Sequence, residues 1–478
     1  MPQARPQRIA GGISAIPSTR GLIVLAAVFL AAGGFAPAEG PKDTGDVSAK
    51  VPETFFAGRL SALEEKLFAD SGDGQLDEHS LLEAALIASG AEDTKTVSRY
   101  ESQLDALAAE FRKSSDKTAD PRRRAIAVFE FMHARVLRGN YRIECTDLRE
   151  ALSQGDFNCV SASVLYNCLA ERMGLTVRGL EIPGHAMSRV VLDKGPLEVE
   201  TTCPSWFRLM GDPRKQAEMV KKTLGRDPAK ARATAREVSP VEMVAMIYYN
   251  RGVDLLADKQ FEQAAVANAK ALWLDPSSTT ARGNLLATIN NWAIAAGSKH
   301  QFAEAVDLLH RGLALDPKYP TFTPNYVHIH HQWMEHLCGA GEFEEALEVL
   351  CRAETKLPDR PYFHRASMDV YRRWARSLFE QGKPDAAFAL FTRAKSRHGT
   401  VPEVLAAEAG AVNDQGLALL KRGQAEEALA VFDRGLAVQP NAKLLRTNRR
   451  KAAEQRATSD PARGSARSAG PDVVGNGG

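Results

Sequence analysis

The stretch GDFNCVSASVLYNCLAERMGL, residues 155–175, predicts the helix around which the first domain is built. Asn158 is a good N-cap and Gly174 a good C-terminal stop, so we expect a helix from about residue 159 to residue 173. Cys159 then lies in the first turn, where free backbone N–H groups and the helix dipole stabilise a thiolate and can hold an oxyanion. The buried stripe of this helix is expected to consist of Ala162, Leu165, Leu169 and Met173.

The second cysteine of this stretch, Cys168, lies nine residues beyond Cys159. Nine helical residues correspond to roughly 14 Å along the axis and about half a turn around it. Cys168 therefore cannot pair with Cys159 within the helix, and we interpret it as a core residue. The chain has six cysteines and no C-x-x-C motif, which argues against a disulfide scaffold, a zinc ribbon and a thioredoxin-like site.

Residues 175–207 change character, because LTVRGLEI, HAMSRVVL and LEVETT are short and rich in β-branched residues. The turn signal DKGP between the last two predicts an antiparallel hairpin in which Leu192 pairs with Leu197 and Arg189 faces Glu200. The two-residue period of a strand places His185 on the same face as Glu198 and Glu200. Either carboxylate could orient the imidazole, and helices followed by a small sheet indicate an α+β domain.

The segments NCVSASVLYNCLAERMGL and GHAMSRVVLDKGPLEVETT resemble the transglutaminase-like cysteine-enzyme superfamily, and IPGHAM resembles its bacterial Pro-Gly-His branch. The resemblance covers roughly residues 123–206 and implies a papain-like α+β fold. It assigns the nucleophile to Cys159, the base to His185 and the acid to Glu200. Two positions depart from the family pattern, since the acid is usually Asp and the residue after His-Ala is often aromatic, where this chain has Met187.

The resemblance implies acyl transfer without a cofactor or a metal, and we expect amide or peptide hydrolysis. The thiolate of Cys159 would attack an amide carbonyl, and His185 would protonate the leaving amine. Water or a second amine could then resolve the thioester, and the sequence does not separate hydrolysis from cross-linking. The alternative is a non-catalytic adaptor whose first domain is a degenerate binding module.

From residue 239 the pattern is helical and repeats every 41 residues. Small residues recur in register at 264, 305, 346, 387 and 428, and again seven residues later. Pro or Gly follows five residues after that, at 276, 317, 358, 399 and 440. Small residues let two helices approach closely and Pro or Gly ends the second helix, so we predict five helical hairpins in an all-α solenoid. The pattern resembles the tetratricopeptide repeat.

By analogy with that repeat, certain positions of each first helix line a groove that receives a protein or peptide partner. In the third and fourth copies the candidates are His328, His331, Glu335, Arg372 and Arg376. Arg372 and Arg376 are four residues apart and could hold a peptide carboxylate. The alternative is an ordinary solvated face with ion pairs between helices. No metal motif is complete in this histidine-rich stretch.

Residues 1–38 carry three arginines and no acid, and an apolar run of 11 residues at 22–32 is followed by Ala36-Pro37-Ala38. This pattern is typical of a secretory signal, with an uncleaved anchor through residues 21–38 as the alternative. We therefore expect an exported protein, periplasmic or extracellular. The formal net charge of +2 gives no reason to expect a nucleic-acid partner.

The predicted organisation follows from these features. It comprises a signal or anchor at 1–38, a linker at 39–52, the transglutaminase-like domain at 53–210, a connecting segment at 211–238, the repeats at 239–457 and a disordered tail at 458–478.

Overall fold

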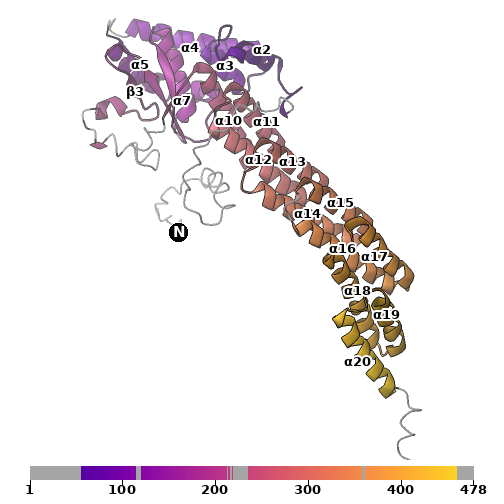
Figure 1. Ribbon diagram of the computed structural model, residues 1–478. Helices are drawn as coiled ribbons and strands as arrows, with labels where there is room; N and C mark the ends of the chain where they lie inside the picture. Colours follow the sequence, from indigo (N-terminus) through magenta and orange to yellow (C-terminus); the bar gives the residue numbers. More distant parts are fainter. Residues whose placement is uncertain are drawn as a thin grey trace, which may run out of the picture. The chain divides into compact units, whose positions relative to one another are not determined.

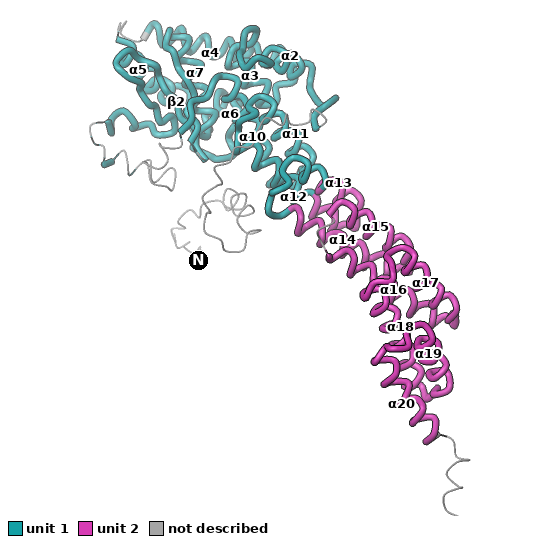
Figure 2. The backbone as a smooth tube through the Cα atoms, in the orientation of Figure 1, with its two compact units in different colours: residues 1–292, 310–321 teal, residues 293–309, 322–478 magenta. Residues whose placement is uncertain are grey.

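The computed structural model describes residues 55–114, 120–182, 184–210, 235–357 and 361–459, together with residues 212, 214, 215 and 218. The predicted signal, the linker and all but the first two residues of the predicted tail lie outside these residues. The chain divides into two compact units, coloured separately in Figure 2. Unit 1 comprises residues 1–292 and 310–321, and unit 2 comprises residues 293–309 and 322–478.

Unit 1 begins with helices, as the sequence predicts (Figure 1). Two of them start with a reciprocal capping box, Ser61 with Glu64 and Ser80 with Glu83, which satisfies backbone N–H groups at the N-terminus of each helix. The elements are α2 (Ala62–Asp70), η2 (Ser71–Asp73), α3 (Leu81–Ala88), α4 (Thr94–Ser114), α5 (Pro121–Arg135), α6 (Leu148–Ser153) and α7 (Cys159–Arg172).

The described residues of unit 1 also form a four-stranded sheet in the order β3-β2-β1-β4, with antiparallel neighbours. The strands are β1 (Val177–Ile182), β2 (His185–Val190), β3 (Leu197–Val199) and β4 (Arg236–Val238), and η3 (Trp206–Leu209) follows β3. Helix α7 packs against β1 and β2, and its interior residues are buried from Val160 to Ala170. The predicted α+β architecture is confirmed.

The register of the predicted hairpin is wrong by two residues. Arg189 pairs with Glu198 and Val190 pairs with Leu197, so Arg189 does not face Glu200. The connection spans residues 191–196 rather than the four residues of DKGP alone, because β2 ends at Val190, two residues earlier than expected, while β3 begins at Leu197. A slip of two residues leaves every side chain on the same face, so Glu198 and Glu200 still share the face of His185.

Strand β4 departs from the predicted connecting segment at 211–238. Residues 236–238 pair with residues 179–181 at the edge of the sheet. A strand of three residues is too short to show a two-residue hydrophobic period, which is why the sequence pattern did not reveal it. The sheet therefore continues to the residue before Ser239, which caps the next helix.

The first helical hairpin belongs to unit 1. It consists of α10 (Pro240–Ala257) and α11 (Phe261–Leu274), and Ser239 and Glu242 form the predicted capping box at its start. Phe68 stacks on Trp273 at a ring-centroid distance of 4.7 Å and meets Tyr248 edge to face. The Glu64 carboxylate accepts bonds from Lys270 Nζ at 2.7 Å and the Tyr248 hydroxyl at 2.9 Å. The N-terminal helices and this hairpin thus share one core.

The second helices of the repeats begin at residues 261, 302, 343, 384 and 425, which reproduces the predicted 41-residue period. The small residues at 264, 305, 346, 387 and 428 are completely buried, and helices end just before Pro276, Pro317, Gly399 and Pro440. The remaining elements are α12 (Thr279–Ser298), α13 (Phe302–Leu315), α14 (Phe322–Ala340), α15 (Phe343–Lys356), α16 (Pro361–Glu380), α17 (Pro384–His398), α18 (Pro402–Lys421), α19 (Ala425–Val438) and α20 (Lys443–Ser459).

Within unit 2 two tryptophans one repeat apart pack between helices. Trp333 stacks on Phe302 at 6.1 Å, and one period later Trp374 stacks on Phe343 at 6.0 Å. Helix α20 extends to Ser459, two residues into the segment predicted as a disordered tail. Among the residues described, no helix is both long and apolar enough to cross a membrane.

Candidate active site

The start of α7 is fixed by Asn158, which is itself buried. Its Oδ1 accepts the backbone N–H groups of Val160 and Ser161 at 2.9 and 3.0 Å, and the Ser161 hydroxyl accepts the N–H of Asn158. The Asn158 Nδ2 donates in turn to the Ile143 carbonyl at 3.0 Å and to Thr146. This double anchoring holds the first turn of α7, and with it Cys159, in one place.

Cys159 is the first residue of α7, and its side chain is only partly buried. Because Asn158 occupies the next two N–H groups, the helix-start N–H best placed for an incoming oxyanion is that of Cys159 itself. It has no backbone or side-chain acceptor among the residues that the structure describes. A tetrahedral adduct on the Cys159 sulfur could use it as a donor.

His185 and Glu200 form a buried pair beside Cys159. His185 Nε2 lies 2.7 Å from Glu200 Oε2, and the two side chains are only 2% and 1% exposed. With Nε2 engaged by the carboxylate, Nδ1 is the ring nitrogen that remains for Cys159. The structure thus brings together the three residues to which the family resemblance assigns a triad.

The surroundings favour a protonated His185. Burial, the largest influence, lowers its pKa, but the Glu200 carboxylate and hydrogen bonding with Cys159 together raise it to about 10. The Glu200 carboxylate also accepts the Thr202 N–H at 3.0 Å and the Thr202 hydroxyl at 2.6 Å. Burial acts to raise the pKa of Glu200, but His185 and these bonds leave it lowered, so the carboxylate stays ionised.

Glu198, the other carboxylate on this face, has a different partner. Arg189 Nη2 lies 3.0 Å from Glu198 Oε1, and Arg189 Nη1 lies 2.6 Å from Glu237 on β4. The sequence left Glu198 and Glu200 equivalent, and the observed register separates them. Glu198 pairs across the β2–β3 ladder with Arg189, whereas Glu200 follows the end of β3 and reaches His185.

Two residues near the pair were missed by the sequence reasoning. Tyr141 is 46% exposed; partial burial, the proximity of Cys159 and Glu200 and a hydrogen bond with Cys159 raise the pKa of Tyr141. His133 on α5 lies near Glu200, and its pKa falls to about 4 because burial outweighs the opposing effects of the Thr201 carbonyl and Glu200. Neither residue stands in a recognisable motif, so no signal in the sequence pointed to them.

Three of the other cysteines, Cys145, Cys168 and Cys203, are more buried than Cys159, whereas Cys338 and Cys351 are partly buried as Cys159 is. Cys168 is completely buried, and burial raises its pKa well above the ordinary value, in agreement with the predicted core role. Burial also raises the pKa of Cys145 to about 11. Cys145 and Cys203 are both buried free thiols in this structure.

Four of the five groove candidates in unit 2 have polar partners within the repeats. Arg372 and Arg376 both lie on Asp414 Oδ2, at 3.0 and 3.2 Å, so the carboxylate that they hold belongs to α18 of the same chain. The Arg373 guanidinium on α16 donates two hydrogen bonds, of 2.8 and 2.9 Å, to the Glu335 carboxylate.

The two histidines of the predicted groove are exposed side chains of α14. The His331 ring nitrogen Nδ1 lies 2.8 Å from the Tyr362 hydroxyl on α16, and His328 stands one turn earlier. In the described part of the chain, no group of three or more His, Cys, Asp or Glu side chains is arranged to hold a metal.

Comparison with known proteins agrees with the fold of this domain. Residues 98–244 match the sequence model of the transglutaminase-like superfamily, which spans α4 to the start of α10 and includes all four strands. No curated protein sequence is significantly similar to the chain.

Two solved structures show a distant likeness. The crystal structure of YrrB, a TPR protein with an unusual peptide-binding site, is 20% identical over 43% of this chain and 92% of that chain, with a TM-score of 0.15. The TPR domain of P58(IPK) is 13% identical over 87% of this chain and all of that chain, with a TM-score of 0.18. Scores this low carry no argument, so the description of the repeats depends on their own period and packing. The chain therefore contains a transglutaminase-like domain at residues 98–244, followed by tetratricopeptide-like helical repeats.

Proposed function

We propose that this protein is a cysteine-dependent acyl-transfer enzyme that hydrolyses amide or peptide bonds. The observation that supports it best is the buried His185–Glu200 pair, at 2.7 Å, next to a cysteine at the first position of α7. A carboxylate that holds one imidazole nitrogen leaves the other to exchange a proton with the thiol and the leaving group. A relic that only binds peptides has no need of an ionised carboxylate buried against a histidine.

The proposed reaction begins with a proton on His185 Nδ1 and a thiolate on Cys159. The sulfur attacks the amide carbonyl carbon, and the oxyanion accepts the Cys159 N–H. As the C–N bond breaks, His185 gives its Nδ1 proton to the leaving amine, and a thioester forms on Cys159. Water then attacks the thioester carbonyl and transfers a proton to His185, which releases the carboxylic acid and restores the ion pair.

The test compares the full-length protein with its Cys159→Ala variant on an extracytoplasmic proteome. Mass spectrometry would map new peptide termini and new isopeptide bonds. We expect new termini that need Cys159. New isopeptide bonds that need Cys159 would make the acceptor an amine rather than water, and the absence of any Cys159-dependent product would favour the adaptor.

We propose that the repeats present substrate proteins to the transglutaminase-like domain. Exposed side chains of α14 and α16, among them His328 and Arg376, support a protein-binding face, although the Arg372 and Arg376 guanidinium groups already share Asp414. A photo-crosslinking amino acid at position 328 should capture the same proteins whose termini change. Capture that is unaffected when the exposed Arg376 is changed to Glu would argue against this face.

We also propose that the protein is exported, on the strength of the apolar run at 22–32 and the small residues at 36–38. Fractionation of expressing cells, with N-terminal sequencing of the mature chain, tests this. Recovery of the chain with its first 38 residues intact in the cytoplasmic fraction would contradict it.

A further inference from the structure

We propose that Arg236 is a positioning residue that fastens the end of β1 leading to His185 onto the first helical hairpin. The α10–α11 hairpin then helps to position the acyl-transfer residues, in addition to being the first hairpin of the repeats. This inference rests on the proposed function, since it concerns how His185 is held beside Cys159.

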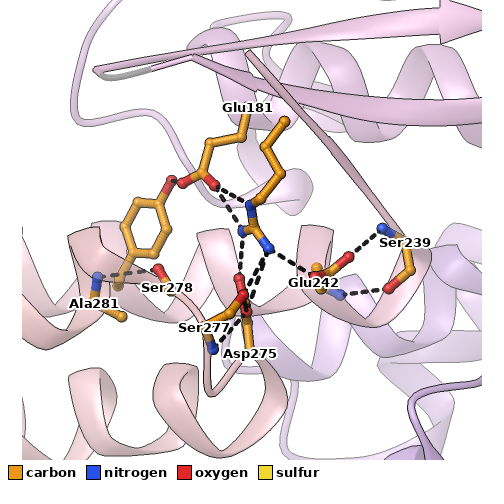
Figure 3. Close-up of polar contacts among 9 residues, drawn as sticks. Glu181, Ser239, Glu242, Asp275, Ser277, Ser278 and Ala281 are labelled. Carbon is orange, nitrogen blue, oxygen red and sulfur yellow. Dashed lines mark hydrogen bonds and ion pairs between the residues drawn. The ribbon is translucent and has the colours of Figure 1, made fainter. Parts of the chain in front are cut away.

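The Arg236 guanidinium joins three carboxylates that come from three different elements, and Figure 3 labels these carboxylates as Glu181, Glu242 and Asp275. Nε and Nη2 bind Glu181 Oε2 on β1 at 3.1 and 2.7 Å, and Nη1 binds Glu242 Oε1 on α10 at 2.7 Å. Nη2 also binds Asp275 Oδ2, at the end of α11, at 2.5 Å. All three guanidinium nitrogens are engaged, which only the planar fork of an arginine can do.

Glu181 lies at the point of the sheet from which a displacement would reach His185. In the β1–β2 ladder Glu181 pairs with Ala186, and the next pair is Ile182 with His185. On its other side Glu181 pairs with Arg236 itself. We call Arg236 and its three carboxylates the Arg236 clamp. Glu181 of this clamp is therefore one residue away from the Ile182–His185 backbone pair, which sets the position of the imidazole.

The second oxygen of Glu181 is also held, and by α10. The Tyr249 hydroxyl donates to Glu181 Oε1 at 3.3 Å. Tyr249 is buried, and its pKa is raised first by that burial and then by the nearby charges of Glu181 and Cys159. The same tyrosine thus lies close to the clamp and to the nucleophile, which links α10 to both sides of the site.

The three carboxylates can stay close together only because Arg236 supplies the positive charge that they share. Asp275 is 4% exposed and Glu181 is 13% exposed at the side chain, so water screens their repulsion poorly. If Arg236 loses its charge, three carboxylates face one another across β1, α10 and α11, and the end of β1 must move away from the hairpin. A lysine restores the charge, but its compact ammonium group cannot reproduce the planar spacing of the three guanidinium nitrogens that bind these carboxylates.

The experiment measures the rate at which iodoacetamide alkylates Cys159 in the full-length protein between pH 5 and pH 10. Peptide mass spectrometry separates Cys159 from the other five cysteines. The His185→Gln variant defines how much of the rate depends on the imidazole. We expect Arg236→Met to lower the His185-dependent rate at pH 7 roughly tenfold and to move its pH profile toward that of His185→Gln, with Arg236→Lys in between.

Arg172→Met is the matched control. Arg172 also bridges two carboxylates in unit 1, with Asp105 at 2.8 Å from Nε and Glu101 at Nη2. It lies at the last position of α7, at the opposite end of the helix from Cys159. Its loss should lower stability while leaving the Cys159 rate within about twofold of the wild-type value.

If Arg236→Met does not fold, Glu181→Gln replaces it, because the amide keeps the shape of the side chain and loses its charge. Suppose that the variant that folds alkylates Cys159 at the wild-type rate and with the wild-type pH profile, while His185→Gln is slow. This result would overturn the inference about Arg236 and leave the proposed function intact. A His185→Gln rate equal to that of the wild type would instead overturn the proposed function, and this inference with it.

Discussion

At the scale of single residues, the length of the Glu200 side chain explains how the His185–Glu200 pair forms in the observed β2–β3 register. Ser188 pairs with Val199, so residue 200 stands nearest Met187 and two positions along β2 from His185. Two strand residues correspond to roughly 6.6 Å. The carboxylate must cover that diagonal, and the additional methylene of glutamate lets it do so at 2.7 Å from Nε2.

This geometry predicts that Glu200→Asp is harmful here, although aspartate is the usual residue of the family at this position. The shorter side chain should leave His185 Nε2 without its carboxylate, and the buried aspartate would have only Thr202 as a partner. We expect Cys159 alkylation at pH 7 to slow about as much as in Glu200→Gln. An Asp variant as fast as the wild type would show that the register or the reach is not as described.

The same pair predicts how stability depends on pH. The pKa of His185 rises from 6.5 in the unfolded chain to about 10 in the folded protein. The folded state then binds the proton more tightly, so the stabilisation is complete below pH 6.5 and is lost as the pH rises toward 10. The pKa of Glu200 is lowered, so its contribution is lost in the opposite direction, as the pH falls below its unfolded value of 4.5.

The expected slope above pH 6.5 is at most about 1.4 kcal/mol per pH unit. Hydrogen exchange of β2 peptides in increasing urea would measure it at pH 6, 7.5 and 9. The difference in protection between the wild type and His185→Gln should shrink steadily across this range. A difference that stays constant would mean that His185 is neutral in the folded protein.

At the scale of elements, local signals were readable from the sequence and non-local ones were not. The start of α7 follows from the cap of Asn158, and the ends of the repeat helices follow from Pro276, Pro317 and Pro440, because caps and stops act within a few residues. The β2–β3 register and the short β4 depend on pairing between distant segments. The choice between Glu198 and Glu200 needed that register, so face parity alone could not make it.

Within the repeats, the structure adds a small-residue position to those that the sequence analysis used. Residues 252, 293, 375 and 416, all on first helices and in 41-residue register, are Gly or Ala, and Met334 occupies the third place. A Cβ built on Gly416 would come within 2.2 Å of Phe432 Cζ, and Phe432 is completely buried. The close approach of α18 and α19 therefore requires glycine at 416.

Gly416→Ala should lower the free energy of unfolding of unit 2 by roughly 1–3 kcal/mol, since overpacking outweighs the better helix propensity of alanine. Gly339 on α14 is the matched control, because a Cβ there meets no atom within 4 Å. Gly339→Ala should raise stability by about 0.5–1 kcal/mol. Urea unfolding followed by circular dichroism would measure both changes, and equal signs for the two variants would contradict the packing argument.

At the scale of the whole molecule, the functional unit extends beyond the family match. The match ends at residue 244, within the first turns of α10, yet Met243 to Tyr249 are buried without a break. The Phe68–Trp273 stack and the Glu64–Lys270 ion pair at 2.7 Å join the N-terminal helices to α11, outside the match at both ends. The Arg236 clamp needs Asp275 as well. A domain cut at the family boundary would leave all of these surfaces open.

Two fragments test where this unit ends. A fragment of residues 53–244 lacks most of α10 and all of α11, so Phe68 and Glu64 lose their buried partners; we expect it to aggregate or to unfold without a cooperative transition. A fragment of residues 53–321 retains the described residues of unit 1. We expect it to unfold cooperatively and to alkylate Cys159 at the rate of the full chain, with the same dependence on His185. A shorter fragment that folds and reacts equally well would make the first hairpin dispensable, and would then assign Arg236 and α11 to the repeats alone.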